Sequence, residues 1–235
     1  MGVFSEVKAL TFDLFGTILD LGGSLTPYIS QFLKSEGCDE TPSRFWETWR
    51  HRQRIEQYQD TIMMMGHSGY HETVRRSLVW TLNLYGISFS TEDILKLMEA
   101  WKELSPFPEV VPALERLKTR YELVALSNGD SHFLDHLAKN RIQWNFDKVI
   151  SVEVIGAFKP HPGVYRRAAA ILELEVGECM MVSSNSFDIV GARSCGFRGA
   201  FVDRYGLPYE DTTFVPDVTV KDFTGLADML VEKRT

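Results

Sequence analysis

The chain has 235 residues, of which 44% are hydrophobic and 24% are charged, and its net charge is −7. This is the composition of an ordinary globular protein, long enough for one sizeable core or for a core with an inserted subdomain. The sequence contains no basic run, and binding to a phosphate backbone needs a clustered cationic face, so no nucleic-acid partner is expected. An anionic ligand would have to be attracted by charges inside a pocket.

The pattern of the sequence leads us to expect no targeting signal. Its three cysteines, Cys38, Cys179 and Cys195, are an odd number without paired spacing, which favours a reduced, cytoplasmic protein over a disulfide framework. The first residues lack a basic region followed by an apolar run, so no signal peptide is expected. No stretch approaches the ~20 apolar residues that span a bilayer, which predicts no membrane partner.

The predicted elements begin with a short buried strand at residues 7–12, which ends at Asp13 and Gly16. From about Tyr28 to Leu104 the pattern is helical, with helices expected at 42–66, 69–85 and 91–104. The last of these has a capping sequence with acidic residues in its first turn, Ser90-Thr91-Glu92-Asp93.

After Pro106 the expected elements alternate between strand and helix. The strands are at 122–126, 148–152, 180–182 and 199–202, and the helices are at 131–140, 162–174, 187–195 and 223–232. This alternation predicts an α/β fold, with a Rossmann-like parallel sheet and helices on both of its faces. The first strand belongs to the same sheet. Residues 1–17 and 105–235 are therefore expected to form the core, and residues 18–104 an all-helical cap inserted after strand one.

Polar residues follow four of the predicted strands, at the edge where such sheets bind ligands. They are Asp13, Ser127 with Asn128, Lys159, and the segment from Ser183 through Asn185 to Asp188. A carboxylate at the first strand end, followed by a turn at Gly16, can attack an electrophilic carbon or phosphorus. Each motif alone also has an ordinary explanation, as a turn aspartate, a helix cap, a surface lysine or a first-turn acid.

Together, the order and positions of Asp13, Ser127, Lys159 and Asp188 resemble the haloacid dehalogenase superfamily, over essentially the whole chain. The family's Mg-dependent phosphatases carry an acid two positions after the nucleophile and another four positions before Asp188. Here those positions hold Phe15 and Ser184. A hard divalent cation prefers several carboxylate ligands, and a leaving alkoxide needs a proton donor. A leaving halide needs no proton, so the loss of these two acids favours a dehalogenase over a phosphatase.

The helical insertion extends the resemblance. Trp49-Arg50-His51-Arg52-Gln53 resembles the Trp-Arg-x-x-Gln segment of the L-2-haloacid dehalogenases. The resemblance implies that Asp13 attacks carbon 2 of a 2-haloacid with inversion, and that halide leaves toward Arg50 and Asn128. Water then cleaves the aspartyl ester with Asp188 as the base. No metal and no organic cofactor is implied.

The implied site residues fall into two overlapping sets. The catalytic set is Asp13, Thr17, Arg50, Ser127, Lys159, Tyr165, Ser183, Asn185 and Asp188. The substrate-binding set is Leu14, Phe15, Arg50, His51, Ser127, Asn128, Lys159 and Phe187. In the second set, Ser127, Lys159 and the backbone N–H groups after Asp13 are expected to hold the substrate carboxylate.

The sequence also departs from the dehalogenase pattern, which has Tyr at the position of Phe15, Gln and Leu at those of His51 and Arg54, and Trp at that of Phe187. These changes favour short substrates such as haloacetates. Relatives often form dimers, which predicts a homodimer. Two alternatives stay open: a phosphatase of the same superfamily that acts on a small metabolite, and a non-catalytic binding protein of the same fold.

Overall fold

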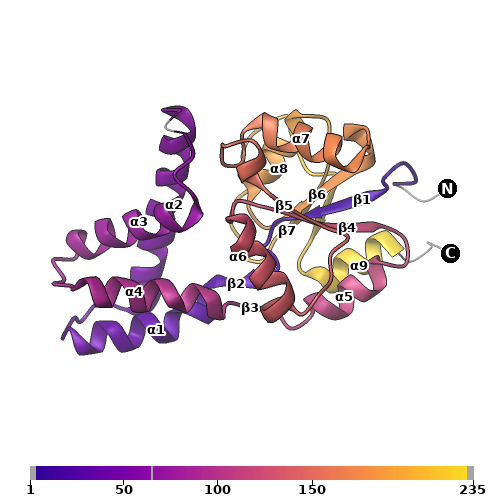
Figure 1. Ribbon diagram of the computed structural model, residues 1–235. Coiled ribbons are helices and arrows are strands. Elements are labelled where there is room, and N and C mark those ends of the chain that lie inside the picture. The colour runs from indigo at the N-terminus through magenta and orange to yellow at the C-terminus, as the bar shows by residue number, and fades with distance from the viewer. Residues whose placement is uncertain (1–3, 65, 232–235) are drawn as a thin grey trace.

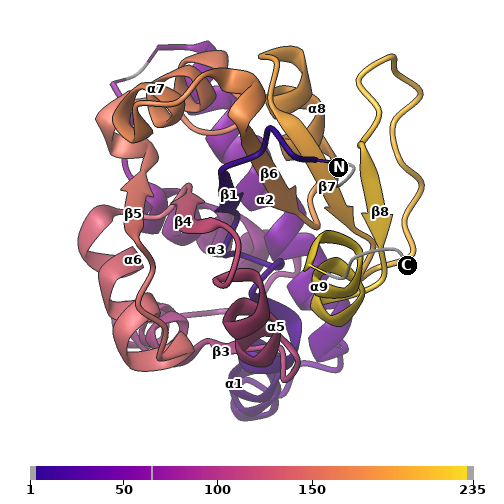
Figure 2. The ribbon, with the colours of Figure 1, turned by 90° about the vertical axis from the view of Figure 1, so that its right-hand side faces the viewer.

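The computed structural model describes residues 4–64 and 66–231. At its centre is a six-stranded sheet in the order β5-β4-β1-β6-β7-β8, which Figure 2 shows from β5 at the left to β8 at the right. All five strand pairs are parallel, as predicted. The strands are β1 (Ala9–Phe12), β4 (Glu122–Ser127), β5 (Lys148–Ser151), β6 (Cys179–Ser183), β7 (Arg198–Val202) and β8 (Val218–Val220).

Helices cover both faces of this sheet. Figure 1 shows α7 and α8 above it and α5 and α9 below it. The helices of this part are α5 (Val110–Leu117), α6 (Ser131–His136), α7 (Pro162–Leu172), α8 (Ser186–Ser194) and α9 (Phe223–Val231). A π-helical turn, Leu137–Ile142, continues α6, and 3-10 turns occur at Val152–Val154 and Val176–Glu178. Every residue of β1 is buried, because strands flank it on both sides and helices cover it on both faces.

Four helices form a separate group at the left of Figure 1. They are α1 (Leu21–Ser35), α2 (Pro42–Ile62), α3 (Tyr70–Leu84) and α4 (Thr91–Glu99), the last followed by a 3-10 turn at Ala100–Glu103. The chain enters this group through β2 (Leu19–Asp20) and leaves through β3 (Ser105–Pro106), and these two strands pair antiparallel. The group is the all-helical cap inserted after β1.

Several predicted boundaries were wrong. The first cap helix begins at Leu21 and not near Tyr28, because Asp20 caps it by accepting a hydrogen bond of 2.9 Å from the Gly23 N–H. Helix α2 ends at Ile62 and not at residue 66. The segment expected as one helix at 91–104 is α4 with a tighter 3-10 turn. Helix α5 and strand β8 were not predicted.

The cap helices start in different ways. Thr41 caps α2 and Pro42 takes its first position. A capping box of Ser90 and Asp93 starts α4, as its sequence predicted. Helix α3 starts at Tyr70, and the residue before it, Gly69, has no side chain to serve as a cap. Asp130 of the core takes this role.

Asp130 links the cap to the core. It follows β4, and it accepts hydrogen bonds of 2.9 and 3.3 Å from the backbone N–H groups of Tyr70 and His71. Its carboxylate also lies 2.8 Å from the His71 ring. The position of α3 relative to the sheet is therefore determined by a side chain of the core. None of the helices in the described ranges is long and apolar enough to cross a membrane.

Candidate active site

The ends of three adjacent strands bring the predicted polar residues together. Phe12 of β1 pairs with Ala125 of β4 and Val182 of β6, so the residues that follow these positions share one edge of the sheet. Asp13 lies at this edge with only 5% of its surface exposed. Just after it, Gly16 turns the chain with φ +84°, a backbone conformation that glycine adopts without strain.

Both carboxylate oxygens of Asp13 have partners. Oδ2 accepts hydrogen bonds from the Thr17 hydroxyl at 3.1 Å and from the Asn185 amide at 2.8 Å. Oδ1 lies 3.4 Å from the Ser127 hydroxyl and 3.5 Å from Lys159 Nζ. The shorter contacts hold Oδ2, while Oδ1 faces a cation and a hydroxyl at longer range. The carboxylate therefore has one defined orientation.

A second buried carboxylate lies behind the lysine. Lys159 Nζ donates to Asp188 Oδ2 at 3.0 Å, and the Tyr165 hydroxyl donates to Asp188 Oδ1 at 2.7 Å. Burial raises the pKa of Asp188; the Lys159 charge opposes this shift, and the Asp13 charge adds to it. A carboxyl group with a raised pKa can exchange a proton closer to neutral pH.

The loop after β6 positions the nucleophile. The Ser183 hydroxyl accepts the Asn185 N–H at 3.1 Å, and the Ser184 N–H donates to the Thr17 hydroxyl at 2.8 Å. Thr17 therefore connects this loop to the Asp13 carboxylate. The structure brings seven of the predicted catalytic side chains into one hydrogen-bonded cluster with Asp13; in chain order they are Thr17, Ser127, Lys159, Tyr165, Ser183, Asn185 and Asp188.

The cap contributes positive charge. Arg50, His51 and Arg54 of α2 line a pocket of about 520 Å³, together with Gly16 and Asn185 of the core. Arg54 Nη2 donates to Asn185 Oδ1 at 2.7 Å. Burial, and then the neighbouring Arg50 charge, lower the pKa of Arg54 to about 10, so it stays charged at neutral pH. Along residues 4–64 and 66–231, neither arginine forms a salt bridge with a carboxylate.

A larger cavity of about 660 Å³ lies between α1 and α4. The side chains that line it include Tyr28, Phe32 and Leu97 but none of the strand-end residues. The smaller pocket beside Asn185 is therefore the candidate substrate site, since chemistry depends on reach to Asp13 and not on volume.

The remaining predicted residues take different positions. Leu14 is fully buried in the apolar core, so its side chain packs and does not line the pocket. Phe15 stacks on Tyr70, with ring centroids 4.2 Å apart. Phe187 lies beside the Arg54 guanidinium at 5.6 Å and does not line the pocket of Arg50. His51 is exposed at the pocket itself.

Asn128 joins the core to the cap. Its oxygen accepts the Lys159 N–H at 2.9 Å, and its amide nitrogen donates to Gln57 of α2 at 3.1 Å. Gln53 was noted only as the end of the Trp49–Gln53 segment, and Gln53, Gln57 and Tyr70 were not among the predicted site residues. For the two glutamines the available signal is their position on the face of α2 that also carries Arg50 and Arg54; Tyr70 is the first residue of α3 and lies outside this pattern.

Comparisons with known proteins agree with this geometry. The family model for haloacid dehalogenase-like hydrolases matches residues 7–196. (S)-2-haloacid dehalogenase H-109 of Pseudomonas putida is 29% identical over 229 residues, covering 96% of this chain and 99% of the relative. Haloacetate dehalogenase H-2 of Moraxella sp. (strain B) is 28% identical over 218 residues, covering 92% and 94%.

A solved structure gives the same result at the level of the fold. The L-2-haloacid dehalogenase from Xanthobacter autotrophicus superposes with a TM-score of 0.85 at 25% identity, covering 95% of this chain and 98% of that one. The parallel sheet, the cap and the strand-end carboxylates are those of a capped α/β hydrolase. The chain belongs to the haloacid dehalogenase-like hydrolases.

Proposed function

We propose that the protein hydrolyses short 2-haloalkanoic acids to 2-hydroxy acids and halide, through an ester formed on Asp13. The observation that carries this proposal is the Asp13 carboxylate, which is held in one orientation near a pocket lined by two cap arginines. Two positions after it stands Phe15, where a phosphatase of this superfamily needs an acid. The names of the similar enzymes, which act on 2-haloacids and haloacetate, support it.

In the first step the substrate carboxylate binds Lys159, Ser127 and the backbone N–H groups that follow Asp13. Oδ1 is the attacking oxygen, because it faces these two side chains at 3.4 and 3.5 Å while Oδ2 is held more closely by other donors. The new bond joins Oδ1 to carbon 2 with inversion. The carbon–halogen bond breaks, and its electron pair leaves with the halide toward Arg50.

In the second step water attacks the carboxyl carbon of the Asp13 ester, and Asp188 accepts its proton. Oδ2 is then the carbonyl oxygen, and the Thr17 hydroxyl and Asn185 amide already donate to it. These donors stabilise the negative charge that develops on Oδ2 during the attack. Collapse breaks the bond between the carboxyl carbon and Oδ1, the departing Oδ1 takes the proton from Asp188 to form the 2-hydroxy acid, and the oxygen of the water stays in the Asp13 carboxylate. Lys159 and Tyr165 hold Asp188 in place.

The phosphatase alternative fits the residues poorly. Phe15 supplies no proton to a leaving alkoxide, and Ser184 has a neutral hydroxyl where Mg²⁺ would need a carboxylate. In the part of the chain that the structure describes, no three His, Cys, Asp or Glu side chains gather where they could hold a metal ion.

The organisation of the chain forms part of the same proposal. We propose that residues 18–104 act as the cap and that residues 1–17 and 105–235 form the core, because the β2–β3 pair lies at this junction. A homodimer is proposed because large apolar side chains on cap helices are exposed, among them Trp80, Leu84 and Leu95. Sedimentation velocity tests this assembly. The free thiols support a reducing, cytoplasmic location.

A halide-release assay tests the function. Chloroacetate and L-2-chloropropionate are supplied with and without EDTA, and phosphate release from a panel of small phosphate esters is measured with Mg²⁺. We expect halide release that EDTA does not change. Phosphate release that depends on Mg²⁺, without halide release, would overturn the proposal, and inactivity in both assays would favour the binding protein. In H₂¹⁸O, repeated turnover should place ¹⁸O in the Asp13 carboxylate.

A further inference from the structure

Within residues 4–64 and 66–231, several buried donor atoms of the cap have no hydrogen-bond partner, and three of them belong to side chains around Arg50 and Asn128. These three are Gln53 Nε2, Gln57 Nε2 and the Tyr70 hydroxyl, and the three side chains are 0%, 3% and 1% exposed. Buried polar atoms in folded proteins nearly always have partners, so each exception needs a physical explanation. All three lie in the region that joins Arg50 to Asn128.

The free atom of each glutamine is its nitrogen, because the oxygen of each amide is already engaged. Arg50 Nη1 donates to Gln53 Oε1 at 2.7 Å, and a guanidinium group can only donate. The Lys159 N–H donates to Asn128 Oδ1, so Asn128 must present its amide nitrogen to Gln57 Oε1, at 3.1 Å. Gln53 and Gln57 are therefore both oriented with Nε2 unused.

The third donor is placed by the core. The Tyr70 ring stacks on Phe15 at 4.2 Å with an interplanar angle of 10°, and Asp130 holds the Tyr70 backbone N–H at 2.9 Å. The hydroxyl lies next to Arg50 and Gln53, whose hydrogen-bonding groups act to lower its pKa, but no contact within the described residues reaches the geometry of a full hydrogen bond. Burial raises the pKa of Tyr70 well above its usual value, so the hydroxyl keeps its proton and can donate.

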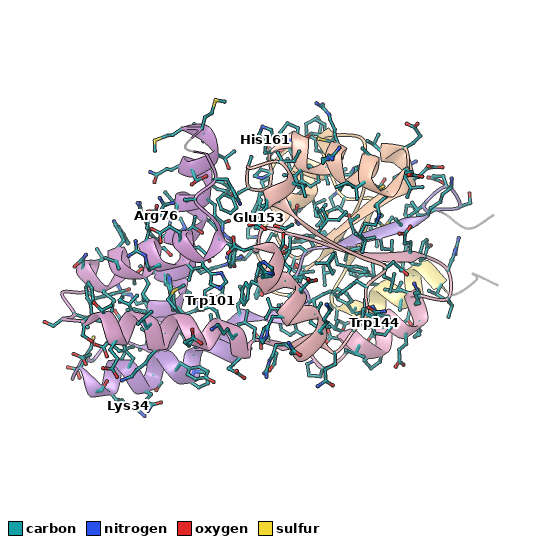
Figure 3. The ribbon with its side chains drawn as sticks, in the orientation of Figure 1. Lys34, Arg76, Trp101, Trp144, Glu153 and His161 are labelled. Carbon is teal, nitrogen blue, oxygen red and sulfur yellow. The ribbon has the colours of Figure 1, made fainter. Side chains whose placement is uncertain are left out.

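These donors converge beside a cation. Gln53 and Gln57 are four residues apart on α2, so they lie on one face of the helix, and Arg50 precedes them on the same side. Trp101 closes the region with its ring 5.8 Å from Tyr70, and Figure 3 shows it where the cap meets the sheet. A small anion bound among these buried donors and beside Arg50 would be strongly stabilised, because its charge would meet them in a region of low dielectric constant.

We propose that Gln53, Gln57 and Tyr70 complete, with Arg50, the site that binds the departing halide. This inference rests on the proposed dehalogenase function and names the cap residues that receive the leaving group. Asn128 then acts mainly by positioning Gln57, to which its amide donates.

Bromide binding to the resting enzyme tests the site without turnover. Heavy halides quench tryptophan fluorescence, and Trp101 lies beside Tyr70, so bound bromide should give a saturable quench. We expect Tyr70→Phe and Gln53→Leu each to weaken bromide binding about tenfold, the effect of one lost hydrogen bond to a charged group. Tyr121→Phe is the matched control, because that buried hydroxyl donates to Leu230 O instead.

Turnover of chloro-, bromo- and iodoacetate separates a halide role from a structural one. Chloride has the highest charge density of the three leaving groups, so Tyr70→Phe should lower kcat most for chloroacetate and least for iodoacetate, with KM nearly unchanged. The double variant Phe15→Tyr/Tyr70→Phe places a hydroxyl on the ring that stacks on residue 70, 4.2 Å away. It should recover part of the kcat that Tyr70→Phe loses.

Two results would overturn the inference: bromide affinity equal to wild type in both single variants, or an equal loss of kcat for all three halogens. A wild-type enzyme that releases no halide would instead refute the proposed function. The bromide titration would then still decide whether these residues form an anion site.

Discussion

Replacing Lys159 with methionine tests the electrostatic arrangement of the site. The ammonium group is 2% exposed and lies 3.0 Å from Asp188 Oδ2 and 3.5 Å from Asp13 Oδ1. Methionine keeps an unbranched, flexible stem but removes the charge. The variant therefore leaves two buried carboxylates facing each other without a cation.

Removal of one partner from a buried ion pair costs about 3–5 kcal/mol of unfolding free energy. For a chain of this size each kcal/mol lowers Tm by about 2–4 °C, so Lys159→Met should lower Tm by about 10 °C near neutral pH. Without the lysine, nothing offsets burial and the Asp13 charge, which raise the pKa of Asp188 further above that of an aspartate in the unfolded chain. The folded variant then binds a proton more tightly than the unfolded chain, so its stability falls as pH rises.

Urea unfolding followed by circular dichroism at pH 5 and pH 8 measures both effects. The control is Lys148→Met, because Lys148 is exposed and donates only to Ile171 O; such a surface change is expected to alter stability by no more than about 0.5 kcal/mol. The double variant Lys159→Met/Asp188→Asn should recover part of the loss. The electrostatic reasoning is refuted if Lys159→Met is as stable as the control, or if it loses the same unfolding free energy at pH 5 and at pH 8.

Three further changes test other parts of the structure. Asp130→Ala removes the cap of α3, so amide hydrogen exchange at Tyr70 should accelerate and stability should fall by about 1 kcal/mol; unchanged exchange would contradict the link between cap and core. Burial acts to raise the pKa of Asp130, but hydrogen bonds from His71 and two backbone N–H groups outweigh it and lower the pKa, so this stabilisation should be lost as pH falls below about 4. Tyr165→Phe removes a hydrogen bond that lowers the pKa of the buried Asp188, so the acid limb of kcat should move to higher pH, and an unmoved limb would argue against Asp188 as the base. Arg54→Leu removes the hydrogen bond that holds the Asn185 amide, which in turn donates to Asp13, so kcat should fall about tenfold. Full activity would show that the contact between Arg54 and Asn185 does not matter.

The core of the fold was predictable because its signals are local. Each central strand is a short apolar run that ends at a polar residue, and strands separated by helices must run parallel. The carboxyl ends of parallel strands meet at one edge, so Asp13, Ser127 and Asp188 could be placed together from their order alone. The structure brings them together as expected.

Other elements were missed where local signals mislead. Gly22, Gly23 and Pro27 are poor helix formers, so the helical pattern becomes clear only near Tyr28, although Asp20 caps a helix that starts at Leu21. Strand β8, three residues long, has only one buried position, so its sequence lacks the apolar run that marked the other strands. Its pairing with β7 defines it.

The sequence by itself determined the chemistry at the sheet edge, because the nucleophile, the lysine and the second carboxylate each follow a strand. Only the tertiary structure decided what the cap presents to them. Polar residues on a helix face usually meet water, and nothing local distinguishes Gln53 and Gln57 from such residues. Docking of α2 and α3 on the core buries them beside Tyr70, and it brings Arg54 to within 2.7 Å of Asn185, across 131 residues of chain.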